Sequence, residues 1–124
     1  MNRKVATAGV VIAVALAGAW AAGAREATKR YGQVREFVIV GDDFAFSPGR
    51  IEVQKDDLVQ LKFTAKDIAH SFTIDAPYRI SKRASTGQTV VFEFRADETG
   101  RFTFYCNLTQ DDRCKKMKGE LIVR

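Results

Sequence analysis

Hydrophobic and polar positions alternate along most of the chain after residue 36. The run LVQLKFT places Val59, Leu61 and Phe63 on one face of an extended chain, with Gln60 and Lys62 on the other. The runs TVVFEFR and RFTFYC repeat this pattern further along. A period of two that is rich in valine and phenylalanine is typical of half-buried β-strands, and we expect these strands to pair antiparallel.

Turn-forming residues separate the runs, in the sequences GDD, SPG, KDD, STG and ETG. We therefore predict strands near residues 36–41, 44–46, 50–54, 58–64, 70–74, 89–96, 101–106 and 119–123. No long helical pattern lies between them, and we expect at most one helical turn, in the loop after Cys106. The pattern predicts an all-β fold, a β-sandwich of about seven or eight strands.

The N-terminal segment follows a different pattern. Arg3 and Lys4 precede an uncharged apolar stretch from Val5 to Ala24. About 20 apolar residues can span a bilayer as a helix, whereas the core of a signal peptide has roughly 7–15 residues. The length favours an uncleaved anchor, but small residues at 19–21 and 22–24 also satisfy the cleavage rule. We expect residues 1–24 to form a hydrophobic helix, either a signal anchor or a signal peptide, followed by a polar linker at 25–35.

Both alternatives export the domain predicted at residues 36–124. The basic residues at the N-terminus hold that end in the cytoplasm, which places the domain on the periplasmic or another extracytoplasmic side. The whole chain carries a net charge of +5, and without residues 1–24 it loses two basic and no acidic residues, which leaves +3. Because acidic and basic residues interleave, we expect a solvated surface and no nucleic-acid partner. The expected contact with a membrane is the N-terminal helix.

Four residues in the C-terminal half are candidates for chemistry. His70 is the only histidine, Cys106 and Cys114 are the only cysteines, and Met117 follows three residues later. His70 and Cys106 fall on the apolar faces of their predicted strands, so we expect both to point inward. Closely spaced sulfur ligands suggest a metal site, and two nearby cysteines in an exported protein equally suggest a disulfide.

The sequence DIAHSFTI, followed further along by GRFTFYCNLTQDDRCKKMKGELIV, resembles the cupredoxin family. That family includes the copper domain of cytochrome c oxidase subunit II and small exported domains similar to it. The upstream stretch FAFSPGRIEVQKDDLVQLKFTAKD extends the resemblance, so that it covers residues 36–124. It implies a Greek-key β-sandwich, with His70, Cys106 and Met117 at the family's ligand positions. Asp67 also fits the family pattern, and Cys114 stands where the second histidine ligand is expected.

This departure changes the chemistry that the resemblance implies. A blue-copper site needs two imidazoles and a thiolate in a plane with a weak axial methionine, and one histidine cannot complete it. The set His70, Cys106, Cys114 and Met117 offers one imidazole, two thiols and a thioether, which favour Cu(I). Gln110 stands where the dinuclear version has its second cysteine, so we expect a single ion. The implied function is copper binding for electron transfer or copper handling, with a redox or copper-donor protein as partner.

The alternative is a metal-free cupredoxin-fold interaction module held together by a Cys106–Cys114 disulfide. If the two cysteines occupy the positions of two ligands of one metal, their sulfurs are close, and such a pair tends to oxidise outside the cytoplasm. The alternatives can be linked, with metal bound only when the pair is reduced. Neither makes the protein an enzyme, and a dithiol oxidoreductase is disfavoured because the CxxC spacing is absent.

The N-terminal segment gives the first testable prediction. If residues 5–24 are an uncleaved anchor, the full-length protein will fractionate with membranes, and its intact mass will include Met1. A protein recovered in the soluble fraction with Arg25 as its first residue would show instead that the segment is a removed signal peptide.

Overall fold

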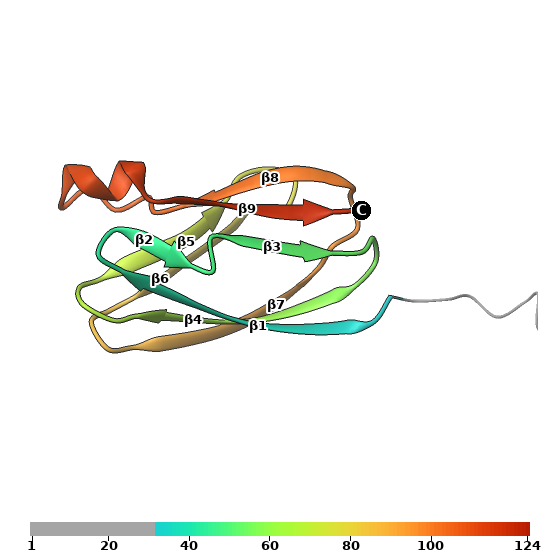
Figure 1. Ribbon diagram of the computed structural model, residues 1–124, viewed down its shortest axis with the longest axis horizontal. Helices are drawn as coiled ribbons and strands as arrows, with labels where there is room; N and C mark the ends of the chain where they lie inside the picture. Colours follow the sequence, from blue (N-terminus) through green and yellow to red (C-terminus); the bar gives the residue numbers. More distant parts are fainter. Residues whose placement is uncertain (1–31) are drawn as a thin grey trace, which may run out of the picture. The chain divides into compact units, whose positions relative to one another are not determined.

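Nine strands form two sheets that face each other in the computed structural model, which describes residues 32–124 (Figure 1). The strands are β1 (Val34–Asp42), β2 (Ala45–Ser47), β3 (Arg50–Val53), β4 (Leu58–Ala65), β5 (His70–Ile74), β6 (Ile80–Ala84), β7 (Thr89–Arg95), β8 (Gly100–Tyr105) and β9 (Lys118–Val123). One sheet has the order β2-β1-β4-β7 and the other the order β3-β9-β8-β5-β6. The prediction of an all-β sandwich is confirmed.

One strand escaped the sequence analysis, so the predicted number of seven or eight strands is too low. Strand β6 has the sequence ISKRA, and only its two end residues are buried. It therefore shows no alternation of apolar and polar positions. The single helical turn expected after Cys106 is present as the short 3-10 helix η1 (Asp112–Lys116).

The expectation of antiparallel pairing is wrong for two pairs of strands. Strand β1 runs parallel to β4, and β3 runs parallel to β9. Alternation shows which face of a strand is buried, but it carries no information on the direction of the neighbouring strand. Parallel neighbours need a crossover connection, and between β1 and β4 the chain supplies it by passing through β2 and β3.

Phenylalanine rings fill the space between the two sheets. Phe72 stacks on Phe104 with 4.8 Å between ring centroids, and Phe46 meets Phe104 edge to face at 5.0 Å. Phe63 lies 6.0 Å from Phe72 and is fully buried. Phe63 and Phe104 are inward residues of the alternating runs, so the pattern identified this part of the core correctly. Aromatic packing of this kind fixes the two sheets against each other at the strands that lead to the candidate site.

Asp57 organises the end of the sandwich at which β1 begins. Its buried carboxylate accepts hydrogen bonds from the backbone N–H groups of Gln33 and Gln54, at 2.8 and 2.9 Å, and from Arg35 Nε at 3.3 Å. Burial alone would raise the pKa of Asp57, but these hydrogen bonds outweigh it and hold the pKa below its ordinary value. The C-terminus lies at this same end, because the Arg124 carbonyl accepts a hydrogen bond from the backbone N–H of Lys55.

The hydrophobic helix predicted for residues 1–24 lies outside the described residues, as does most of the predicted linker. Within residues 32–124, no helix is long and apolar enough to cross a membrane.

Replacing Asp57 by asparagine should lower the free energy of unfolding by about 1–3 kcal/mol at neutral pH, because two buried N–H donors and Arg35 lose a charged acceptor. The folded state depresses the pKa of Asp57, so its contribution is present above the ordinary value of 3.8 and disappears as the pH falls below it. Urea unfolding at pH 7 and at about pH 3 should therefore show the difference between parent and variant shrinking in acid.

Asp56→Asn provides a matched control one position away. Asp56 has a positive φ of 71°, which asparagine tolerates, so this variant should unfold like the parent. Equal unfolding of Asp57→Asn and the parent at pH 7 would contradict the role assigned to the Asp57 carboxylate.

Candidate metal centre

His70 is the first residue of β5, and its side chain is fully buried. Its Nε2 lies 2.7 Å from Oδ1 of Asp67 and donates a hydrogen bond to it. In the neutral ring this leaves Nδ1 with a free lone pair. Nδ1 is the one buried side-chain nitrogen or oxygen in the described part of the chain that has no hydrogen-bond partner. Buried polar atoms are nearly always paired, so this atom needs a functional explanation.

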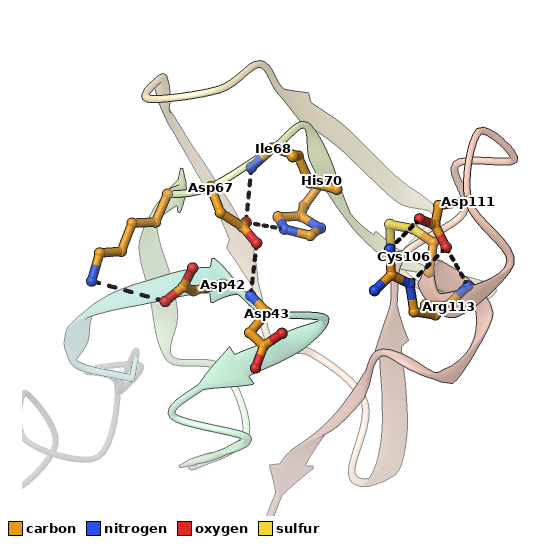
Figure 2. A network of polar contacts seen from close by, with 10 residues as sticks. Asp42, Asp43, Asp67, Ile68, His70, Cys106, Asp111 and Arg113 are labelled. Atoms are coloured by element: carbon orange, nitrogen blue, oxygen red, sulfur yellow. Dashed lines mark hydrogen bonds and ion pairs between the residues drawn. A yellow bond between two sulfur atoms is a disulfide. The ribbon is translucent and has the colours of Figure 1, made fainter.

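Asp67 holds His70 and the turn after β1 together, as Figure 2 shows. Its Oδ1 also accepts the N–H of Ile68 at 2.8 Å, and its Oδ2 accepts the N–H of Asp43 at 3.0 Å. Partial burial alone would raise the pKa of Asp67 above its ordinary value of 3.8. These hydrogen bonds have the larger effect and lower the pKa to about 2. The carboxylate is therefore ionised at neutral pH, and it fixes the orientation of the imidazole as an outer carboxylate does for a metal-binding histidine.

Met117 is fully buried and lies beside His70. Gly41 of β1 shows how close they are, since a Cβ added there would lie 3.0 Å from Met117 Cε and 3.2 Å from His70 Cδ2. Any larger residue at position 41 would push into the space between the thioether and the imidazole. Gly41 was not among the predicted site residues, although a glycine inside a strand often marks a close approach of this kind.

Cys106 and Cys114 form a disulfide, with 5.5 Å between their Cα atoms. Both are buried, and the described residues contain no free cysteine. The backbone N–H of Cys106 donates to the Met117 carbonyl at 3.2 Å, and the N–H of Met117 donates to the Cys114 carbonyl at 3.1 Å. The three sulfur-containing residues therefore lie in one compact segment, which contains η1 and joins the end of β8 to the start of β9.

Ser71 and Asn107 directly follow the candidate ligands His70 and Cys106, and they are hydrogen-bonded to each other. Ser71 Oγ donates to Asn107 Oδ1 at 2.6 Å and accepts the Asn107 backbone N–H at 2.8 Å. Ser71 is buried, and Asn107 directly follows Cys106. This pair ties the start of β5 to the end of β8, and so fixes His70 relative to Cys106. Sequence reasoning missed it, because only the fold brings the two residues together.

The structure thus brings His70, Met117 and the two cysteines to the same end of the sandwich, but the disulfide removes both thiolates. Among residues 32–124 no group of three or more histidine, cysteine, aspartate or glutamate side chains is arranged to hold a metal ion. Reduction of the pair would add two thiolates to the free imidazole nitrogen and the thioether, and that soft donor set suits Cu(I). The fit to copper therefore depends on the redox state of the cysteines.

A sequence profile described as a cupredoxin-like domain matches residues 10–123. The chain belongs to the cupredoxin-like family. A comparison with curated proteins finds no match.

Several solved structures share the fold at low sequence identity. Auracyanin A, described as a "blue" copper protein of Chloroflexus aurantiacus, is 17% identical with a TM-score of 0.64, over 73% of this chain and 99% of that one. The periplasmic domain of cytochrome oxidase subunit II from Bradyrhizobium japonicum is 16% identical with a TM-score of 0.64, over 73% and 83%. A chain of a heme-copper terminal oxidase dimer is 17% identical with a TM-score of 0.64, and the match covers 73% of this chain and 65% of that longer one.

Protein purified without reductant and then denatured should contain no reactive thiol, and after reduction it should contain two. Cys114→Ser should lower the free energy of unfolding by about 2–3 kcal/mol, because the loop closed by the disulfide no longer restricts the unfolded chain. Thiol titration and urea unfolding measure these outcomes. Two reactive thiols in the unreduced protein would contradict the disulfide.

Proposed function

We propose that this cupredoxin-like protein is an exported or membrane-tethered copper-handling protein that binds one Cu(I) when its disulfide is reduced. The observation that carries this proposal is the buried Nδ1 of His70, which is oriented by Asp67 and has no protein partner. Met117 lies next to the same imidazole, and the disulfide lies in the loop that contains Met117. His70, Cys106, Cys114 and Met117 are the proposed ligands.

Reduction converts the crosslink into ligands. A dithiol donor gives two electrons and two protons to the disulfide, and the donor itself becomes a disulfide. The two cysteines lose their protons when they bind metal, so uptake releases protons and weakens in acid. Bound copper would supply a soft cation that neutralises one of the two thiolate charges. Two thiolates favour Cu(I) over Cu(II), which supports copper handling more than electron transfer.

The partner of this site is proposed to be a redox or copper-donor protein, and the protein itself performs no catalytic step. The loop around the cysteines carries the basic residues Arg113, Lys115, Lys116 and Lys118 and the acidic residues Asp111 and Asp112. This excess of positive charge would favour a partner with an acidic surface. Export is supported by the disulfide, since such bonds persist mainly in oxidising compartments.

The second candidate function is a metal-free interaction module. The disulfide is the observation that favours it, because an exported domain of this size gains stability from such a crosslink. In that case the cysteines stabilise the fold, and reduction would only weaken it.

Copper titration of the reduced, oxygen-free protein separates the two candidates. We expect one Cu(I) per chain, and Cys106→Ser should lose binding because only one thiolate remains. Cys114→His supplies a second imidazole, so with Cu(II) it should develop the intense thiolate-to-copper absorption of a blue site. The parent with Cu(II) should lack this absorption.

The oxidised parent protein is the matched control, and it should bind no Cu(I) because both sulfurs are occupied. Suppose the reduced parent takes up no Cu(I) and Cys114→His stays colourless with Cu(II). The copper proposal then fails, and the metal-free module is the function that remains.

A further inference from the structure

Phe44 lies against His70, and Arg113 lies against Phe44. The ring of Phe44 meets the imidazole of His70 edge to face, with 5.7 Å between centroids. The guanidinium carbon of Arg113 lies over the Phe44 ring, 4.2 Å from its centroid. Phe44 is half-buried, whereas His70 beneath it is fully buried. Phe44 therefore covers part of the buried imidazole, and Arg113 lies on Phe44; we call these two side chains the cover.

The turn after β1 holds Phe44 in a backbone conformation that phenylalanine rarely adopts. Asp43 and Phe44 have positive φ angles of 51° and 57°. Such angles suit glycine, asparagine or aspartate, and they are rare for a bulky residue. The turn is held by the N–H of Asp43, which donates to the same Asp67 carboxylate that orients His70. A phenylalanine kept here against local preference indicates a role for its ring.

Arg113 links the cover to the disulfide. It belongs to η1 and immediately precedes Cys114. Asp111 holds its guanidinium through two hydrogen bonds, from Nε to Oδ1 at 3.1 Å and from Nη2 to Oδ2 at 2.8 Å (Figure 2). A 3-10 helix of five residues has little stability of its own, so the bond from Cys114 to Cys106, with the buried Met117 at its end, anchors it on the sandwich.

We infer that Phe44 and Arg113 are positioning residues that control access to His70, and that reduction of the Cys106–Cys114 bond opens their cover. In the oxidised protein the disulfide fixes η1 and keeps Arg113 on Phe44. Two electrons and two protons from a dithiol break that bond, η1 loosens, and Arg113 leaves the ring. Access to the imidazole then coincides with the appearance of the two thiols, so the donor groups become available together. This regulation rests on the proposed function, whereas the cover itself does not.

Diethyl pyrocarbonate tests the cover without any metal, because it modifies exposed imidazoles and this chain has one histidine. The full-length oxidised protein should react slowly at His70, as followed by mass spectrometry of the peptide that contains it. Phe44→Asn should raise the rate about tenfold or more while leaving the melting temperature unchanged, since asparagine suits the turn but carries no ring. Arg113→Gln should raise it less, and Arg113→Lys should restore most of the protection.

Reduction with a phosphine that is then removed should raise the rate in the parent and add little in Phe44→Asn. Lys82→Gln is the matched control, because Lys82 lies over Phe92 at 5.7 Å in a similar cation–π pair that involves neither Phe44 nor His70. It should leave the rate unchanged.

A fast reaction in the oxidised parent, or rates in Phe44→Asn and Arg113→Gln equal to the parent rate, would overturn the cover. An unchanged rate on reduction would overturn its coupling to the disulfide. Failure of the reduced parent to bind Cu(I) would overturn the proposed function but would leave these rates as they are.

Discussion

The bond between Cys106 and Cys114 determines the chemistry of one end of this sandwich. It joins Cys106, the first residue after β8, to the middle of η1, and it fixes the segment that carries Met117. While it is intact, both sulfurs are buried and neither is a thiolate. A two-electron reduction would exchange a crosslink worth about 2–3 kcal/mol for two soft ligands. Structural support and the proposed metal binding thus depend on the same two sulfur atoms, and they exclude each other.

The other half of the candidate site does not depend on that bond. His70 is fixed by the Asp67 carboxylate, by its place at the start of β5 and by the tie between Ser71 and Asn107. The imidazole therefore keeps its orientation whether the cysteines are oxidised or reduced. A side chain that is ordered in advance lowers the entropic cost of binding a ligand.

The sequence was informative wherever a local pattern decides the outcome. Alternation located β4 through Val59, Leu61 and Phe63, and it placed the aromatic core on the correct faces. It failed for β6, whose middle residues are exposed, and it could not show that β1 and β4 run parallel. Pairing direction is set by the path of the chain between the strands, which no single run of residues encodes.

In the candidate site, too, residue types could be recognised from the sequence, whereas contacts between distant residues could not. His70, Cys106, Cys114 and Met117 stood out by residue type and order, and the disulfide was one of the two alternatives that they left open. The hydrogen bond from Asp43 to Asp67 spans 24 positions, and the contact of Arg113 with Phe44 spans still more. Contacts at that separation depend on the finished fold, so the cover could not be predicted from spacing.

The parallel pairing of β1 and β4 has a mechanical consequence. Their register runs without a break from Val34 opposite Leu58 to Gly41 opposite Ala65. A pulling force applied ahead of Val34 along the strand would load these ladder hydrogen bonds in shear, all together, instead of peeling them one by one. The domain should therefore bear tension on its N-terminal side. Gly41, which lies close to His70 and Met117, is the last residue of that ladder, so the candidate site lies at the end of β1 away from the applied force.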